Sequence, residues 1–174
     1  MNAINKLIVL YGEQNVGKTT TLKKAFKMLT GCNFPARGDG RVIFKVGDTT
    51  VFMATYGDKP HYVETNFNFF HSATRSNAVI YELDGGALVK IGTERQQQLK
   101  PDICITACRI YKNGTANDVY NCLCEEILKD MPIVGGVKWI AKQVAEGNRT
   151  QQRAVNTDHL TALEIVAEIM KSVK

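Results

Sequence analysis

The chain has 174 residues, of which 44% are hydrophobic and 22% are charged, and its formal net charge at pH 7 is +5. This length and balance are those of one globular domain covering residues 1–174, and they exclude a disordered chain. No apolar run is long enough to cross a membrane, and the modest charge does not indicate a nucleic-acid partner. Because the first predicted strand leaves no room for a signal peptide, we expect a cytoplasmic protein.

The first predicted elements are a strand and a helix joined by a glycine loop. Residues 4–10 form an apolar run long enough for a buried parallel strand. After the loop, Leu22, Phe26 and Leu29 recur at helical spacing, and the helix is expected to end near Gly31. Between strand and helix, residues 12–19 read GEQNVGKT and fit the pattern G-x-x-x-x-G-K-[ST].

Residues 12–19 resemble the phosphate-binding loop of P-loop NTPases. The resemblance implies that loop amides and the start of the helix cradle phosphates, that Lys18 lies along the β- and γ-phosphates, and that the Thr19 hydroxyl binds Mg²⁺. It also implies that Glu13 is a candidate for orienting the attacking water. The expected nucleotide-binding residues are Gly12, Gln14, Asn15, Val16, Gly17, Lys18, Thr19 and Thr20.

A β-hairpin is predicted next, with strands at residues 41–46 and 50–55. The second strand is apolar on both faces, as expected of a central strand, but no acid stands at its end where P-loop proteins carry a magnesium ligand. Gly57 could offer its amide to the γ-phosphate. Asp58, the nearest carboxylate, could reach the metal through a water or orient the attacking water. It could equally cap the helix that opens at Pro60.

A second hairpin is expected at the edge of the sheet, within a possible insertion covering residues 74–92. Its strands are residues 78–83 and 87–91, and an Asp-Gly turn closes it. Asp84 is the rival acid for the magnesium site, although turn chemistry explains it without a metal.

Residues 103–108 form another predicted buried strand, and Arg109 follows directly at its carboxyl end. Arg109 could stack on a base, contact phosphate or lie in solvent. At this point GTPases carry N-K-x-D, whereas residues 107–110 read ACRI. Guanine specificity is therefore not supported, and ATP is preferred over GTP as the expected ligand.

The last third of the chain is expected to form a helix to about residue 130, a strand at 137–145 and a closing helix capped by Asn156 or Thr157. The polar loop 146–156 before that helix holds Arg149 and Arg153. Both are candidates for neutralising charge on a transferred phosphoryl group, although solvated loop arginines would look the same.

The remaining chemistry-bearing residues are interpreted as structural. Trp139 is expected in the core. The five cysteines have no C-x-x-C pair, and the three histidines have no ligand spacing, so we expect reduced and buried thiols rather than a zinc site.

Together these patterns predict an α/β protein, a three-layer α/β/α sandwich on a mostly parallel sheet with a β-hairpin before the central strand. The leading functional hypothesis is Mg²⁺-dependent binding and hydrolysis of a nucleoside triphosphate, ATP rather than GTP. One alternative is a kinase whose small-molecule or nucleotide acceptor binds near arginines such as Arg37. Another is a non-catalytic nucleotide-sensing module that acts on a protein partner.

Overall fold

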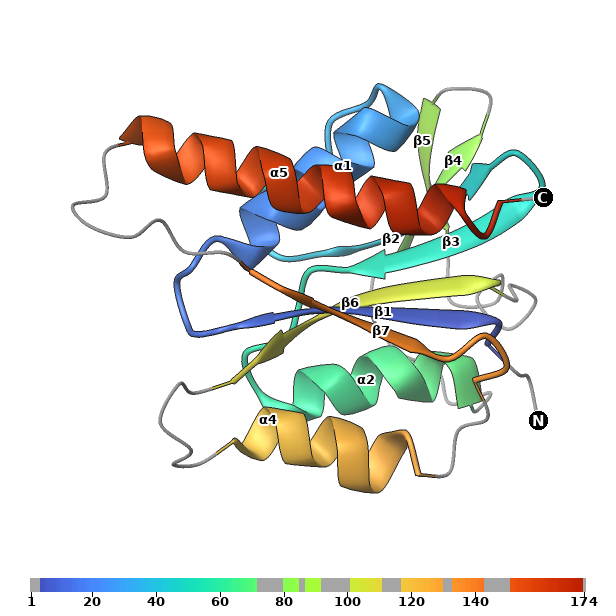
Figure 1. Cartoon of the computed structure of the whole chain (residues 1–174). Coiled ribbons are helices and arrows are strands. Elements are labelled where there is room, and N and C mark those ends of the chain that lie inside the picture. Colours follow the sequence, from blue (N-terminus) through green and yellow to red (C-terminus); the bar gives the residue numbers. More distant parts are fainter. Residues whose placement is uncertain are drawn as a thin grey trace.

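The computed structural model describes residues 4–71, 80–84, 87–91, 101–110, 117–129, 133–142 and 151–173. They form a mixed α/β fold in which helices cover both faces of one sheet (Figure 1). The α/β class and the mostly parallel sheet expected from the sequence are therefore confirmed. No helix in the described ranges is long and apolar enough to span a membrane.

The described elements comprise seven strands, four α-helices and one π-helix. The strands are β1 (Lys6–Gly12), β2 (Arg41–Val46), β3 (Thr49–Ala54), β4 (Ile80–Asp84), β5 (Ala87–Ile91), β6 (Ile103–Arg109) and β7 (Val137–Ala141). The helices are α1 (Lys18–Thr30), α2 (Pro60–His71), α4 (Asp118–Asn121) and α5 (Gln151–Met170), with the π-helix η1 (Cys122–Ile127) directly after α4.

The seven strands follow the order β5-β4-β2-β3-β6-β1-β7. Strand β1 runs parallel to its neighbours β6 and β7, and β3 runs parallel to β6, so these four strands end at the same edge of the sheet. Strand β3 is the middle strand, and it forms an antiparallel hairpin with β2 as expected. Because ligands of parallel sheets bind beyond the carboxyl ends of the strands, we call this edge the carboxyl edge.

The strand directions place Asp84 away from the predicted magnesium site. Strand β2 is antiparallel to β3, and β4 is parallel to β2. The carboxyl end of β4, where Asp84 lies, therefore points to the edge opposite the carboxyl edge. The hairpin β4–β5 does form one margin of the sheet, as expected of an edge insertion.

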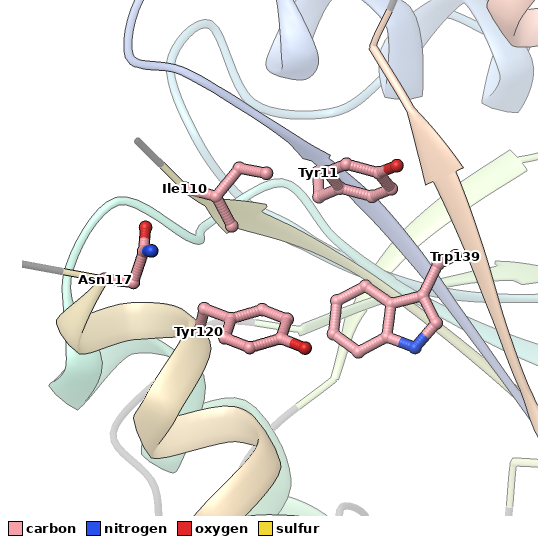
Figure 2. Close-up of a pocket in the computed structure, with 5 residues that line it drawn as sticks. All are labelled: Tyr11, Ile110, Asn117, Tyr120 and Trp139. Carbon is pink, nitrogen blue, oxygen red and sulfur yellow. The ribbon is translucent and has the colours of Figure 1, made fainter. Parts of the chain in front are cut away.

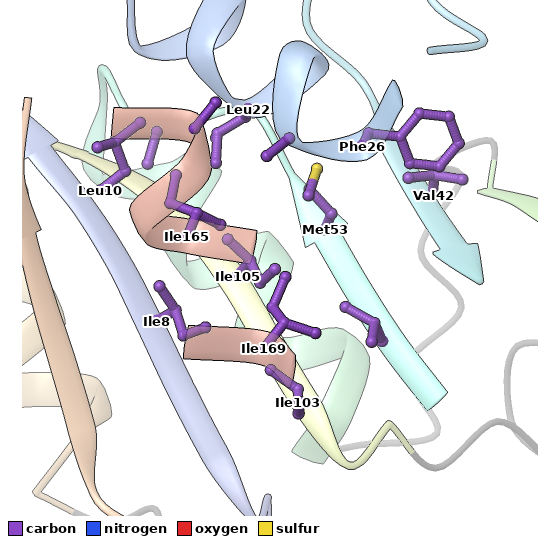
Figure 3. Close-up of a cluster of buried hydrophobic side chains, with 14 of the residues drawn as sticks. Ile8, Leu10, Leu22, Phe26, Val42, Met53, Ile103, Ile105, Ile165 and Ile169 are labelled. Carbon is purple, nitrogen blue, oxygen red and sulfur yellow. The ribbon is translucent and has the colours of Figure 1, made fainter. Parts of the chain in front are cut away.

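Alternating residues of the strands supply the cores on the two faces of the sheet. On the face of α1 and α5, Ile8 and Leu10 of β1 belong to one buried cluster with Ile165 of α5 and Phe26 of α1 (Figure 3). On the face of α2, α4 and η1, the intervening residues of β1 pack with Val63 and other apolar side chains. Each of these buried side chains contributes about 1.5–3 kcal/mol of transfer free energy. The two buried faces explain why β1 reads as an unbroken apolar run.

Several boundaries differ from those predicted, and the last strand, predicted over residues 137–145, ends at Ala141. Strand β1 extends to Gly12, which pairs with Arg109, whereas Ile4 makes only an isolated bridge to Ile133. Helix α5 begins at Gln151, so Arg153 lies in a helix and not in a loop, and Asn156 and Thr157 lie within the helix instead of capping it. Polarity predicted a loop there, but glutamine, arginine and alanine are all good helix formers.

The predicted helix near residues 119–130 is a short α-helix followed by a π-helix. The amide of Leu128 donates to the carbonyl of Leu123, five residues back, at 2.8 Å. Residue spacing alone does not distinguish this wider turn from an α-helix. Asn117 occupies the N-cap position of α4 without a side-chain capping hydrogen bond.

Candidate functional site

The glycine loop lies at the carboxyl edge, where it connects the end of β1 to the start of α1. Its turn requires left-handed backbone at Asn15, with φ 61°, and at Gly17, with φ 92°. Asparagine tolerates this conformation and glycine adopts it without strain. A Cβ atom at Gly17 would also lie 3.1 Å from Asp158 Oδ1. The second glycine of the pattern is thus favoured by its backbone angle, and a Cβ atom there would be in tight contact with Asp158.

Lys18 is the most buried charged side chain of the loop, with 6% of its side chain exposed. Its Nζ donates to the carbonyls of Gly12 at 3.2 Å and Glu13 at 2.6 Å, and lies 3.6 Å from Asp58 Oδ1. Burial lowers the pKa of Lys18, and the nearby carboxylate of Asp58 opposes this shift. The loop therefore surrounds the ammonium of Lys18, and the charge of Asp58 does not fully offset the desolvation of that ammonium.

The amides of the loop add to this positive site. The first helical hydrogen bond of α1 is donated by Thr21 to the carbonyl of Gly17, at 2.9 Å. Within the described ranges, no backbone carbonyl accepts a hydrogen bond from the amides of residues 14–19. Such amides and the positive end of the helix dipole bind anions.

The Thr19 hydroxyl donates to Asp39 Oδ1 at 2.8 Å. The same oxygen accepts from the hydroxyl of Thr55 at 3.0 Å, and the amide of Gly40 donates to Thr55 Oγ1 at 2.9 Å. Thr55 follows directly after β3, so a loop carboxylate reaches the end of the central strand that lacks an acid of its own. These oxygen donors suit Mg²⁺, and Asp39 is a functional candidate that the sequence did not indicate.

Gly57 and Asp58 occupy the turn between β3 and α2. Gly57 is packed so closely that a Cβ atom would lie 2.1 Å from the carbonyl oxygen of Ala107, and its own carbonyl accepts from the amide of Arg109 at 2.8 Å. Asp58, 46% exposed, faces Lys18 and has no described contact with Thr19. The metal and water-orienting roles of Asp58 and the phosphate contact of Gly57 stay predictions.

Of the four arginine candidates, Arg109 lies at the loop, whereas the backbone carbonyl of Arg37 accepts a hydrogen bond from Lys23 Nζ at 2.8 Å and its phosphate-acceptor role stays a prediction. The other two have no described side chain. Arg109 Nη1 donates to Gln14 Oε1 at 3.4 Å, which brings this guanidinium over the glycine loop. Arg149 lies outside the described residues, and the side chain of Arg153 is also outside them. Glu13 and Thr20 are exposed beside the loop, so the water-orienting role of Glu13 stays a prediction.

A second buried lysine supports the loop from the other side. Lys142, directly after β7, has 1% of its side chain exposed and lies 2.8 Å from Asp158 Oδ1 of α5. Thr21 donates to the same carboxylate oxygen at 3.4 Å. This ion pair joins the end of β7, helix α5 and helix α1 behind Gly17. Lys142 falls inside the strand predicted over residues 137–145, so no signal in the sequence indicated this pair.

A cavity of about 360 Å³ lies next to the loop and is lined by Tyr11, Ile110, Asn117, Tyr120 and Trp139 (Figure 2). Tyr11 immediately precedes the first glycine of the loop, and the amide of Ile110 donates to the Gly12 carbonyl at 3.1 Å. Trp139 packs against a core cluster as expected, but it also forms part of this wall.

The five cysteines are free thiols, of which three are buried as expected, whereas Cys32 and Cys124 are only partly buried. Burial raises the pKa of Cys108 to about 12, and burial together with Glu126 and Glu64 raises the pKa of Cys122 to about 11. Ligand atoms of Glu64, Cys122 and Glu126 lie within 4.8 Å of one another, which is a possible cation site on α2 and η1. Its two glutamates are exposed, and exposed acidic groups are common without a metal.

Comparisons with protein families, curated proteins and solved structures find no match to this chain. The functional argument therefore rests on the residues and geometry of the carboxyl edge. Its main components are the curled loop, the buried Lys18, the amides of residues 14–19 and the Thr19–Asp39 contact.

Proposed function

We propose that the protein is a P-loop NTPase that binds a nucleoside triphosphate with Mg²⁺ and hydrolyses its γ-phosphate, with ATP preferred over GTP. The observation that carries this proposal is the burial of Lys18 inside the glycine loop, where its Nζ donates to the carbonyls of Gly12 and Glu13. A buried cation beside helix-start amides is suited to bind a polyphosphate.

The triphosphate would bind to the amides of residues 14–19, with the ammonium of Lys18 exchanging its carbonyl partners for phosphate oxygens. This exchange gives the ammonium anionic partners that offset the desolvation of its charge. Arg109, which already contacts Gln14, would supply a second positive charge above the loop. These charges stabilise a transition state in which negative charge accumulates on the phosphoryl group.

Thr19 and Asp39 would hold the magnesium ion, because a hydroxyl and a carboxylate within 2.8 Å offer the oxygen donors that Mg²⁺ prefers. Bound Mg²⁺ supplies charge neutralisation on the phosphate oxygens. Asp58, next to Lys18, is the better placed of the two water-orienting candidates, since its carboxylate lies 3.6 Å from the Nζ that would contact the phosphates.

A nucleotide sensor with slow turnover is the second candidate, and the residue at the end of β3 favours it. That position is Thr55, which holds Asp39 only through its hydroxyl. A carboxylate supplied by a loop is held less rigidly than one on a strand. The nucleotide could therefore bind while its γ-phosphate is hydrolysed slowly. Such a protein would act through a protein partner.

Phosphate release from ATP with increasing Mg²⁺ tests the proposal. We expect Mg²⁺-dependent release, and the variant Asp39→Asn should require about tenfold or more Mg²⁺ for half-maximal rate because it weakens one charged ligand. Asp48→Asn, in the exposed β2–β3 turn, is the matched control and should behave as the unmodified protein. Tight ATP binding without release would favour the sensor, whereas neither binding nor release would contradict both candidates.

A further inference from the structure

The cavity beside the glycine loop has the walls of a site for a flat ring. Three of the five lining residues that the structure describes are aromatic, and they come from β1, β7 and α4. The ring centroids of Tyr120 and Trp139 are 5.4 Å apart at 47°, and those of Tyr11 and Trp139 are 6.0 Å apart at 70° (Figure 2). The inclined rings form walls of a cavity of about 360 Å³, a volume within the range of small-molecule sites.

The exposure of the aromatic rings also indicates a ligand. Tyr120 is 40% exposed, and Tyr11 and Trp139 are partly buried, so part of each ring surface is open to a ligand. A planar ligand would cover these surfaces by stacking, which every nucleobase can do through its π-face.

The polar groups of the described lining residues, which are the Asn117 amide, two tyrosine hydroxyls and the indole N–H, restrict the class of ligand further. Asn117 brings one side-chain amide, which carries both donors and an acceptor, and none of the five lining residues carries a charge. An amide of this kind matches the edge of a heterocycle with adjacent donor and acceptor atoms, as in adenine. Because none of these five described residues is charged, they suit a ligand that presents an uncharged ring to them.

We propose that this cavity binds a planar, uncharged heteroaromatic ring of nucleobase size, by stacking on Tyr120 and Trp139 and by hydrogen bonding to Asn117. The cavity adjoins the phosphate loop through Tyr11 and through the hydrogen bond between Ile110 and Gly12. The ring therefore belongs either to the nucleotide whose phosphates the loop would hold or to a separate small molecule. The ring site itself does not rest on the proposed hydrolase function.

The fluorescence of Trp139 measures this binding directly because it is the one tryptophan of the chain. The probes are adenosine, guanosine and ATP, each titrated into the full chain. We expect a saturable change in emission with at least one nucleoside. In Tyr120→Ala the dissociation constant should rise about tenfold or more, because one stacking surface is lost. Leu163→Ala, at an α5 position that is 45% exposed, is the control and should bind as the unmodified chain does.

The variant Lys18→Ala distinguishes the two sources of the ring. If ATP binds more tightly than adenosine and loses that advantage in Lys18→Ala, the ring belongs to the nucleotide on the loop. If ATP and adenosine bind equally in both proteins, the ring belongs to a separate molecule, and the site stands even if the phosphate loop binds nothing. The proposal is overturned if no probe gives a saturable change, or if the change is the same in Tyr120→Ala.

Discussion

At the scale of single residues, Lys18 is held in the fold at an energetic cost. Its ammonium is almost fully buried, and the desolvation that lowers its pKa exceeds the compensation from Asp58. We predict that Lys18→Met is more stable than the unmodified protein without nucleotide, by about 0.5–2 kcal/mol. Denaturant unfolding at pH 7 measures this difference, with Lys27→Met on the exposed side of α1 as the control.

The difference in the free energy of unfolding between Lys18→Met and the unmodified protein should depend on pH. Between the lowered pKa of Lys18 and its ordinary value of 10.5, the unfolded chain binds more protons than the folded one, so the free energy of unfolding rises with pH. The unmodified protein should therefore gain stability relative to Lys18→Met as the pH approaches 10.5. A difference between the two proteins that is constant with pH, or a less stable Lys18→Met at pH 7, would contradict this account.

Asp39 marks the limit of what could be predicted for the site from single residues. The sequence indicated the loop, Lys18 and Thr19 because their spacing is fixed by local backbone geometry. Asp39 stands between two glycines and resembles an ordinary turn residue. Its contacts with Thr19 and Thr55 exist only because the fold joins segments 16 and 20 residues away, so no local pattern records them.

At the scale of the elements, the turn after β3 depends on close packing at Gly57. The Gly57→Ala side chain would place Cβ about 2.1 Å from the carbonyl oxygen of Ala107, which is backbone and cannot move aside alone. We predict a loss of about 3 kcal/mol or more in the free energy of unfolding, measured by thermal or denaturant melting. Gly38→Ala has open space around its Cβ and should change stability little. Equal losses of stability in the two variants would show that close packing at Gly57 is not the cause.

Strand β1 and helix α5 are joined by the ion pair of Lys6 with Glu168, which Lys171 also contacts at 3.0 Å. Hydrogen bonds from Lys6 and Lys171 lower the pKa of Glu168. The stabilisation is therefore present above the ordinary value of 4.5 and is lost as pH falls through the lowered pKa. We predict that Glu168→Gln costs about 1 kcal/mol at pH 7 and little in strong acid.

Stability curves of Glu168→Gln and of the unmodified protein from neutral to acid pH test this contribution. Glu164→Gln, on an exposed position of the same helix, is the matched control. A cost that stays the same in acid would assign the loss to packing rather than to charge.

Most elements were predictable because their signals are local. Apolar runs located the strands of the core, and glycine at position 31 ended α1 in the left-handed conformation, with its amide donating to Lys27. The start of α5 and the π-helix were missed for different reasons. Polar helix formers resemble a loop when periodicity is weak, and the extra residue in each π-turn depends on packing against neighbouring elements.

At the scale of the whole molecule, the sheet order determines which loops meet. Strand β6 enters between β3 and β1, which brings Arg109, the Thr55–Asp39 contact and the glycine loop to one edge. These pairings join strands far apart in the sequence, such as Val51 with Ile103, and strand patterns do not specify partners over such separations. The layered class was thus predictable, whereas the order and the exclusion of Asp84 were not.

The central claim is that the loop around Lys18 binds the phosphates of a nucleoside triphosphate. Calorimetric titration of ATP and of GTP, with and without Mg²⁺, tests it most directly, with Lys18→Ala beside the control Lys27→Ala. We predict Mg²⁺-dependent binding, tighter for ATP, that is lost in Lys18→Ala and kept in Lys27→Ala. The claim would be contradicted by binding that survives in Lys18→Ala, or by no binding of either nucleotide.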